Sequence, residues 1–192
     1  MIRSEPLVVL DAAHNPHGVR AASTAFKEAF ELSHVHAVVG ILGEKDALGI
    51  FEVLREEYVD STDATFRLYL SASDSSRAIA PEELQEIALD AGFDEDIITV
   101  CDHLDEALAT AMENALFEQE SAGVLVTGSV TVIGEVRTLL AQPEESPTAS
   151  RPAPEGLDSD IGLIPSAAPD GGLLDDILAE LAHDEPESDE TQ

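Results

Sequence analysis

Short apolar runs alternate with stretches of helical periodicity along most of this chain. Continuous apolar runs predict strands at about residues 6–10, 35–42, 65–71, 96–101 and 123–127. Apolar residues at helical spacing predict helices at about residues 16–32, 46–58, 80–91, 103–120 and 132–141. Because parallel strands need long crossover connections, this alternation is typical of βαβ units. We therefore expect an α/β fold, in which helices cover both faces of a three-layer, Rossmann-like, mostly parallel sheet.

Capping residues mark several helix starts. Asn15 followed by Pro16 predicts an N-cap with proline in the first turn, where its missing N–H costs nothing. Pro81 is placed in the same way, and Asp102 is a candidate cap for the helix at 103–120. The first helix therefore begins only a short turn after the first predicted strand.

The character of the chain changes after Gln142. Residues 143–170 are a mixture of Pro, Ala, Ser, Gly and Asp that cannot bury enough apolar surface to order, so we expect a disordered linker. We expect a domain at 1–142 and an acidic tail at 143–192. Within the tail, a one-sided stripe of leucine and isoleucine predicts a short amphipathic helix at 172–183, which either docks on the domain, binds a partner's groove or stays frayed.

The charge of the chain narrows the choice of partners. It has 9 Lys and Arg against 40 Asp and Glu, a formal net charge of −31, which repels phosphate backbones and anionic lipids. We expect no nucleic-acid partner, no membrane span and a cytoplasmic, monomeric protein. Cys101 is the single cysteine, so no internal disulfide can form, and we expect its thiol to be buried and inert.

The turn after the first strand carries candidate chemistry. Asp11 falls at the carboxyl end of the strand, and His14 lies just before the helix that Asn15 caps. In open α/β sheets ligands bind beyond the carboxyl ends of the strands, and a helix N-terminus there attracts anions. Asp11 and His14 are therefore predicted to face such a crevice. The alternative is structural, with Asp11 as a helix-entry cap and His14 bonded to a backbone carbonyl.

A pair of histidines and a Gly-Ser pair are further candidates for a site. His34 and His36 alternate on a strand, but two histidines without a nearby carboxylate or cysteine in the sequence do not make a metal site, so none is predicted. Gly128 and Ser129 either form part of a site or only make the turn before the last helix.

Four motifs occur in the order found in one enzyme family. The chain resembles the C-terminal, glutamate-ligase domain of the Mur ligase superfamily, and is most similar to folylpolyglutamate synthase/dihydrofolate synthase. The resemblance covers about residues 1–142. Its motifs are D-x-A-H-N-P at 11–16, G-x-x-x-D-K-D at 40–46 with Glu44 in place of aspartate, P-R-A at 76–78 with Ser76 in place of proline, and G-S with G-E-x-R at 128–137.

The resemblance implies an ATP- and Mg²⁺-dependent ligase that joins L-glutamate to folate or dihydropteroate through an acyl phosphate. It implies that Asp11 and His14 are catalytic and, with Asn15, approach the nucleotide. It also implies that Lys45 and Ser129 bind the carboxylates of the incoming amino acid. Arg77 is expected to add to substrate binding, in a role that the sequence does not define.

The sequence lacks one part of this machinery. Neither Lys27 nor Lys45 follows the glycines of a phosphate-binding loop. We therefore expect a C-terminal fragment that needs a missing N-terminal ATP-binding domain and is inactive alone. The alternatives are a non-catalytic, stand-alone binding module and the same domain of a cell-wall Mur ligase.

Overall fold

Six strands form one sheet in the computed structural model, which describes residues 3–4 and 6–141. The predicted tail at 143–192, with its linker and helix, lies outside the described residues. The elements, in chain order, are β1 (Arg3–Ser4), β2 (Leu7–Leu10), α1 (Pro16–Ala29), β3 (His34–Val39), α2 (Ala47–Arg55), the π-helical turn η1 (Glu56–Asp60), β4 (Thr65–Leu70), α3 (Pro81–Asp90), the 3-10 turn η2 (Glu95–Ile97), β5 (Ile98–Val100), α4 (Leu104–Phe117), β6 (Ala122–Thr127) and α5 (Val130–Ala141).

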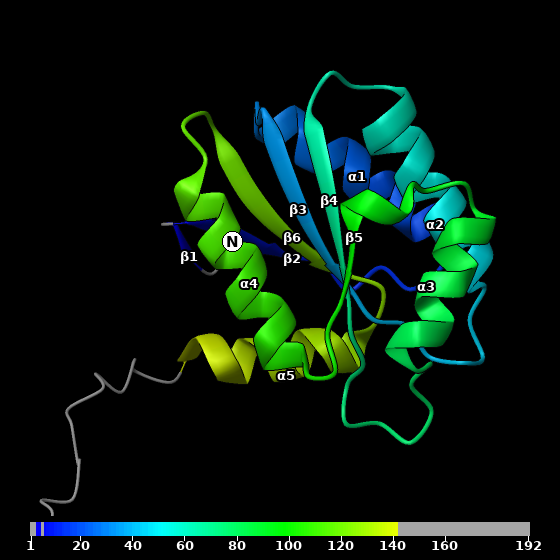
Figure 1. The fold of residues 1–192 in the computed structure, drawn as a ribbon. Helices are drawn as coiled ribbons and strands as arrows, with labels where there is room; N and C mark the ends of the chain where they lie inside the picture. The colour runs from blue at the N-terminus through cyan, green and yellow to red at the C-terminus, as the bar shows by residue number, and fades with distance from the viewer. Residues whose placement is uncertain (1–2, 5, 142–192) are drawn as a thin grey trace, which may run out of the picture. The chain divides into compact units, whose positions relative to one another are not determined.

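The order of the strands explains where the helices lie. The sheet runs β1-β2-β6-β3-β4-β5, and all pairs are parallel except β1 with β2 (Figure 1). The chain moves in one direction from β2 to β5 and then returns to place β6 between β2 and β3. Because parallel crossovers are right-handed, the forward connections put α1, α2 and α3 on one face, and the return puts α4 on the other.

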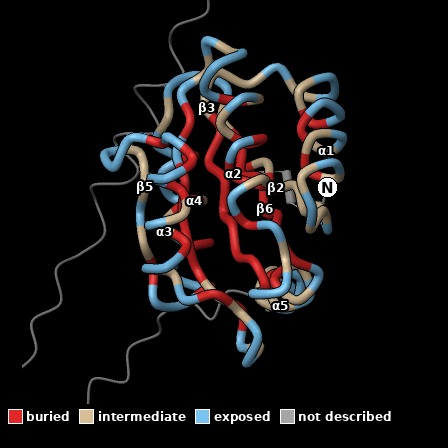
Figure 2. The backbone as a smooth tube through the Cα atoms, turned by 90° about the vertical axis from the view of Figure 1, so that its right-hand side faces the viewer, coloured by how far each residue is buried: buried red, intermediate tan, exposed pale blue. Residues whose placement is uncertain are grey.

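The core has two layers, one on each face of the sheet. Alternate residues of the central strands point to opposite faces, so Leu125 packs with α1, α2 and α3, and its neighbours Val124 and Val126 pack with α4 and α5. Buried positions follow the central strands, and the helices carry buried and exposed residues in turn (Figure 2). The prediction of a three-layer, mostly parallel α/β sheet is confirmed.

Some elements end at other residues than predicted, in part because a buried apolar residue is not always paired in a strand. The apolar run at 35–42 pairs only as far as Val39, because Ile41 and Leu42 are buried in the loop that follows. The helix predicted at 46–58 ends at Arg55 and continues as a π-helical turn. The candidate cap Asp102 is wrong: His103 is the N-cap residue of α4 and makes no side-chain capping bond. The short antiparallel strand β1 was not predicted.

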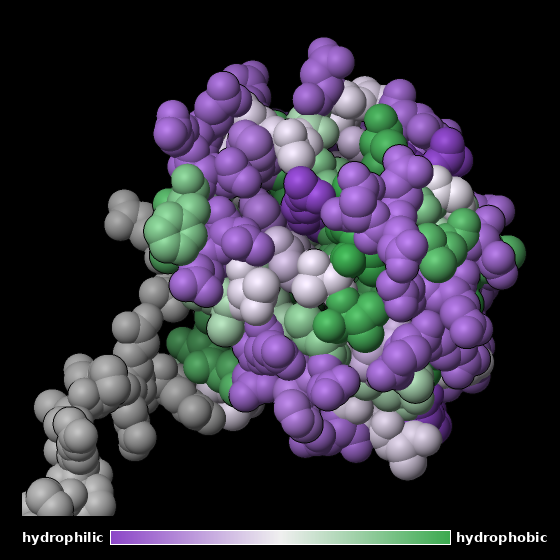
Figure 3. Space-filling model, in the orientation of Figure 1, coloured by the Kyte–Doolittle hydropathy of each residue, from purple (hydrophilic) through white to green (hydrophobic). Residues whose placement is uncertain are grey.

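The surface of the described part is mainly hydrophilic in the view of Figure 3. Apolar side chains form small, separate groups on it. Among the described residues, no helix is both long and apolar enough to span a bilayer.

Candidate active site

Four loops meet at the carboxyl edge of the sheet. They follow β2, β3, β4 and β6, and they carry all of the site residues predicted from the sequence. Since β2, β6, β3 and β4 are neighbours in the sheet, the topology brings together residues as far apart in the chain as His14 and Ser129.

Backbone contacts hold the loops after β2, β3 and β6 together. The N–H of Asp11 donates to the carbonyl of Val126 at 3.0 Å, and the N–H of Gly128 donates to the carbonyl of Ala13 at 3.0 Å. Gly128 has φ +101°, and a Cβ atom there would lie 2.7 Å from the carbonyl oxygen of Gly40. Only glycine permits this close approach, so it fixes how the loops after β3 and β6 meet.

The loops after β3 and β4 are joined in the same way. The N–H of Gly43 donates to the carbonyl of Arg77 at 2.8 Å, and the N–H of Ile79 donates to the carbonyl of Ile41 at 3.0 Å. An isolated antiparallel bridge pairs Leu42 with Ala78. These bonds place the Arg77 side chain beside the segment that carries Lys45.

A cavity of about 230 Å³ lies where the loops meet. It contains four of the six predicted site residues, and one of these comes from each of the four loops. Its lining residues are His14, Leu42, Glu44, Lys45, Arg77, Gly128, Ser129, Val130 and Thr131.

Two cations line this cavity although the chain as a whole is strongly acidic. Lys45 is half-buried, and Arg77 is exposed and paired with Glu44 at 2.9 Å. The side chains of this pair are 64% and 44% exposed, so solvent screens it and it contributes little stability. A bound carboxylate can therefore replace Glu44 on the guanidinium at small cost.

The hydroxyl of Ser129 is fixed by its neighbours. Ser129 is 1% exposed, and its Oγ lies 2.7 Å from Thr131 Oγ1 and accepts the N–H of Thr131 at 3.2 Å. Thr131 Oγ1 also lies 3.0 Å from Ser73 Oγ. Thr131 and Ser73 were not predicted from the sequence. No motif could have found them, because only the turn after β6 and its packing against the loop after β4 bring the three hydroxyls together.

In the loop after β2, the predicted site residues Asp11, His14 and Asn15 each contact the local backbone, and only His14 lines the cavity. The Asp11 carboxylate accepts the N–H of Ala13 at 2.7 Å, and Asp11 is not among the residues that line the cavity. His14 lines the cavity, and its Nδ1 lies 3.0 Å from the carbonyl of Ala12. The side chain of Asn15 accepts the N–H of Gly18 at 2.8 Å as the N-cap of α1. Asn15 is thus the N-cap of α1, as predicted, whereas Asp11 closes the turn before the helix and does not cap it. His14 both contacts a backbone carbonyl and lines the cavity.

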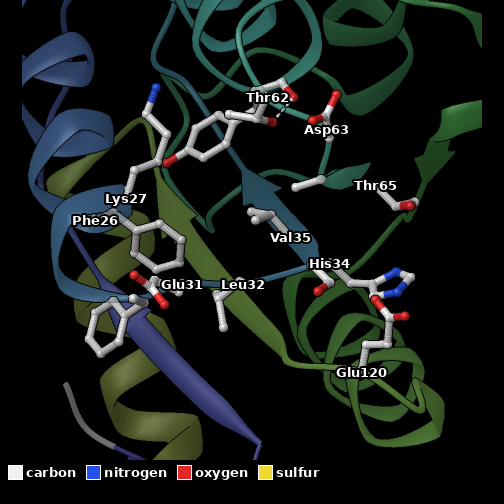
Figure 4. Close-up of a pocket in the computed structure, with 14 residues that line it drawn as sticks. Phe26, Lys27, Glu31, Leu32, His34, Val35, Thr62, Asp63, Thr65 and Glu120 are labelled. Atoms are coloured by element: carbon white, nitrogen blue, oxygen red, sulfur yellow. Dashed lines mark hydrogen bonds between the residues drawn. The ribbon is translucent and has the colours of Figure 1, made fainter.

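A larger cavity, of about 460 Å³, lies at the opposite end of the strands. His34 and Glu120 lie on one side of it, and Lys27 and Phe26 lie on the other (Figure 4). Burial raises the pKa of Tyr58, one of its lining residues, to about 12. None of the predicted site residues contributes to this cavity.

Cys101 and the two histidines of β3 are the remaining candidate residues. Cys101 is 3% exposed, and burial raises the pKa of its thiol, which disfavours the reactive thiolate. Folding does bring a carboxylate, that of Glu118, near His34 and His36. Within residues 3–4 and 6–141, however, no group of three His, Cys, Asp or Glu side chains is arranged to hold a metal ion.

Comparison with known proteins gives a consistent match. A family model for the Mur ligase, glutamate ligase domain matches residues 1–130. A dihydrofolate synthase/folylpolyglutamate synthase from Mycobacterium tuberculosis is 31% identical over 153 residues, which cover 73% of this chain and 29% of the relative. A probable bifunctional folylpolyglutamate synthase/dihydropteroate synthase from Haloferax volcanii is 31% identical over 136 residues, 70% of this chain and 14% of the relative.

Solved structures agree with these sequence matches. The structure of M. tuberculosis folylpolyglutamate synthase complexed with ADP and AMPPCP has a TM-score of 0.64 at 29% identity, and the match covers 74% of this chain and 31% of that one. Escherichia coli FolC in complex with DHPP and ADP has a TM-score of 0.59 at 26% identity, with 73% and 30% covered. The chain therefore spans less than a third of the length of these relatives.

Proposed function

The chain belongs to the Mur ligase, glutamate ligase domain family, and we propose that it serves as the glutamate-binding domain of an ATP-dependent folylpolyglutamate synthase or dihydrofolate synthase. The relatives named above carry those activities in their names, and the cavity at the carboxyl edge is the observation that supports extending them to this chain. A cell-wall substrate is the less favoured alternative, because these relatives are named for folate chemistry.

The cavity suits an amino acid with two carboxylates. Lys45 and Arg77 provide two positive charges, and Ser129 provides a buried hydroxyl whose position is fixed by Thr131. Charged hydrogen bonds to a carboxylate are the strong kind, and bidentate pairing with arginine adds orientation. In this proposal the three side chains hold the carboxylates of L-glutamate, so that its amine is presented to the activated folate carboxylate.

The nucleotide needs groups beyond this cavity. His14 faces the cavity beside the N-terminus of α1, a position suited to phosphate oxygens, and we assign His14 and Asp11 to the phosphate side of the reaction. Glu44 is the single carboxylate among the lining residues and pairs with Arg77, so this cavity does not fit Mg²⁺, a cation that needs oxygen ligands. We assign the metal and most contacts to ATP to an ATP-binding domain outside this chain. The 192 residues alone are then inactive.

A chimeric enzyme tests the role of the cavity. Residues 1–142 replace the matching part of the M. tuberculosis relative, and ADP release is measured against glutamate concentration. Lys45→Ala is expected to raise KM for glutamate about tenfold or more, since a charged hydrogen bond contributes about 1.5–3 kcal/mol. Arg77→Ala is expected to act in the same direction.

Arg55→Ala is the matched control. It removes the same charge from the far end of α2, where Arg55 pairs with Asp60 rather than lining the cavity. Its KM for glutamate should equal that of the parent chimera. Equal KM values for the Lys45, Arg77 and Arg55 variants would contradict the assignment.

A further inference from the structure

A third cavity, distinct from the proposed ligase site and from the cavity beside Tyr58, lies on the face of the sheet that carries α4. Its volume is about 460 Å³. The strand register puts His36 beside Arg67 and Tyr69 beside Thr99 on this face. Among the described residues, the helices on this face are α4 and α5, and they leave β4 and β5 open next to the end of α4. The lining residues are His36, Arg67, Tyr69, Asp96, Thr99, Asn114, Phe117 and Glu118.

The floor of this cavity is a hydrogen-bonded chain of three side chains. Asn114 Nδ2 donates to the Tyr69 hydroxyl oxygen at 2.9 Å, and the same oxygen lies 3.0 Å from His36 Nδ1. Burial lowers the pKa of His36 and raises that of Tyr69, so both side chains are uncharged at neutral pH. The arrangement fixes the plane of the imidazole ring.

One nitrogen of this ring has no hydrogen-bond partner among the described residues. His36 is 2% exposed, and its Nε2 makes no hydrogen bond within the described part of the chain. It faces Oε1 of Glu118 at 3.9 Å, which is too long for a direct bond. A single donor atom placed about 2.8 Å from each of the two atoms would bridge them.

The carboxylate of Glu118 is poorly compensated. It is 32% exposed, and its ion-pair contacts among the described residues are with His34 at 3.4 Å and with His36 at 3.9 Å. Arg67 lines the same cavity but donates to the backbone carbonyl of Asp96, and among the described residues Glu118 has no ion pair with a lysine or an arginine. Its carboxylate oxygens are therefore available as acceptors for a positively charged donor, and charge-assisted hydrogen bonds of this kind are strong.

We propose that this cavity binds the ammonium group of a small primary amine, with Glu118 and His36 Nε2 as its acceptors and the exposed Phe117 at its rim. When Nδ1 carries the ring proton and donates to Tyr69, Nε2 is an acceptor and the phenolic proton is available to the ligand. Phe117 is 77% exposed, and its ring face is attractive to a cation. The overall charge of −31 concentrates amines near the surface.

Both a zwitterionic amino acid and a diamine carry such an ammonium group. Arg67 also lines the cavity, and its Nη1 donates to the backbone carbonyl of Asp96 at 2.9 Å, which leaves its other N–H groups for a ligand. A zwitterionic amino acid would use Arg67 for its carboxylate, whereas a diamine would not. The contribution of Arg67 therefore distinguishes the two sources.

Titration of the full 192-residue chain with 1,4-diaminobutane and with alanine tests the proposal. Binding is followed by calorimetry and by the ¹⁵N resonances of the His36 ring, in about 0.15 M salt so that diffuse attraction is screened. Glu118→Gln should weaken binding about tenfold or more, because it removes a charged hydrogen bond. Arg67→Met should weaken the binding of alanine alone.

Glu113→Gln is the matched control, since it removes one negative charge from an exposed position of α4 outside the cavity. It should bind amines as the unaltered chain does, and thermal unfolding confirms that both variants fold. If neither amine binds at millimolar concentration, or if Glu118→Gln and Glu113→Gln change binding equally, the proposal is wrong.

Discussion

Single residues fix the carboxyl edge of the sheet, and Gly128 is the most constrained of them. Its positive φ and its approach to the carbonyl of Gly40 cannot accommodate a side chain. The sequence motifs include Gly128 and Ser129 but do not give the reason for the glycine, because the clash is with Gly40, in the loop after β3, nearly ninety residues earlier in the chain.

We predict that Gly128→Ala lowers the free energy of unfolding by about 2–4 kcal/mol, from backbone strain and the clash together. Gly134→Ala is the control: no atom lies within 4 Å of a Cβ there, and α5 gains helix propensity of about 1 kcal/mol. Denaturant unfolding of both variants checks this. Equal stabilities for the two variants would show that the close approach at Gly128 is not restrictive.

The buried imidazole of His36 makes stability depend on pH. Burial lowers its pKa below the ordinary value of 6.5, so the unfolded chain takes up the proton first and stability falls as the pH drops below about 6.5. The slope from this one group is at most about 1.4 kcal/mol per pH unit.

Unfolding free energies of the unaltered chain and of His36→Gln at pH 7.5 and 5.5 measure this effect. The unaltered chain should lose more stability on acidification than the variant does. Parallel losses in the two proteins would mean that other groups carry the pH dependence.

Most helix starts were predictable, because capping is decided by adjacent residues, although Asp102 does not cap α4. Asn15 and Pro16 begin α1 as the sequence indicated. Helix and strand ends were less predictable: Ile41 and Leu42 look like strand residues but are buried in a loop, where the carbonyl of Ile41 accepts the N–H of Ile79. Most buried residues of the central strands are also paired in the sheet. Where a buried residue is not paired, as at Ile41, hydropathy alone does not reveal it.

We predict that Asn15→Ala destabilises the fold by about 1 kcal/mol, since it removes the cap on the N–H of Gly18. Asp46→Ala, which uncaps α2 at the N–H of Gly49, should cost a similar amount. Asn15→Asp keeps an accepting oxygen and should retain most of the stability. Thermal unfolding of the three variants would contradict this account if Asn15→Asp were as unstable as Asn15→Ala.

At the scale of the whole molecule, the alternation of strands and helices along the sequence was enough to predict the fold class. Predicting which residues form the site also requires the order of the strands in the sheet. His14, Lys45, Arg77 and Ser129 meet because β6 returns to the middle of the sheet, and no spacing in the sequence encodes that return. The Ser129–Thr131–Ser73 hydroxyl chain and the cavity beside α4 depend on the same three-dimensional packing.

The net charge of −31 is also a property of the whole molecule. Like charges repel in the compact state, and salt screens them over about 8 Å at physiological ionic strength. We therefore predict that Tm rises by several degrees between low salt and about 1 M NaCl. A Tm that stays constant or falls over this range would show that self-repulsion does not limit stability.

We propose above all that this chain supplies the glutamate-binding domain of a ligase whose ATP-binding domain lies outside these 192 residues. The most direct measurement is ADP release dependent on both folate and glutamate, made on the 192-residue chain alone and on the chimera that carries residues 1–142. The account predicts activity in the chimera and none in the chain alone. Activity in the chain alone, or a folded chimera without activity, would contradict it.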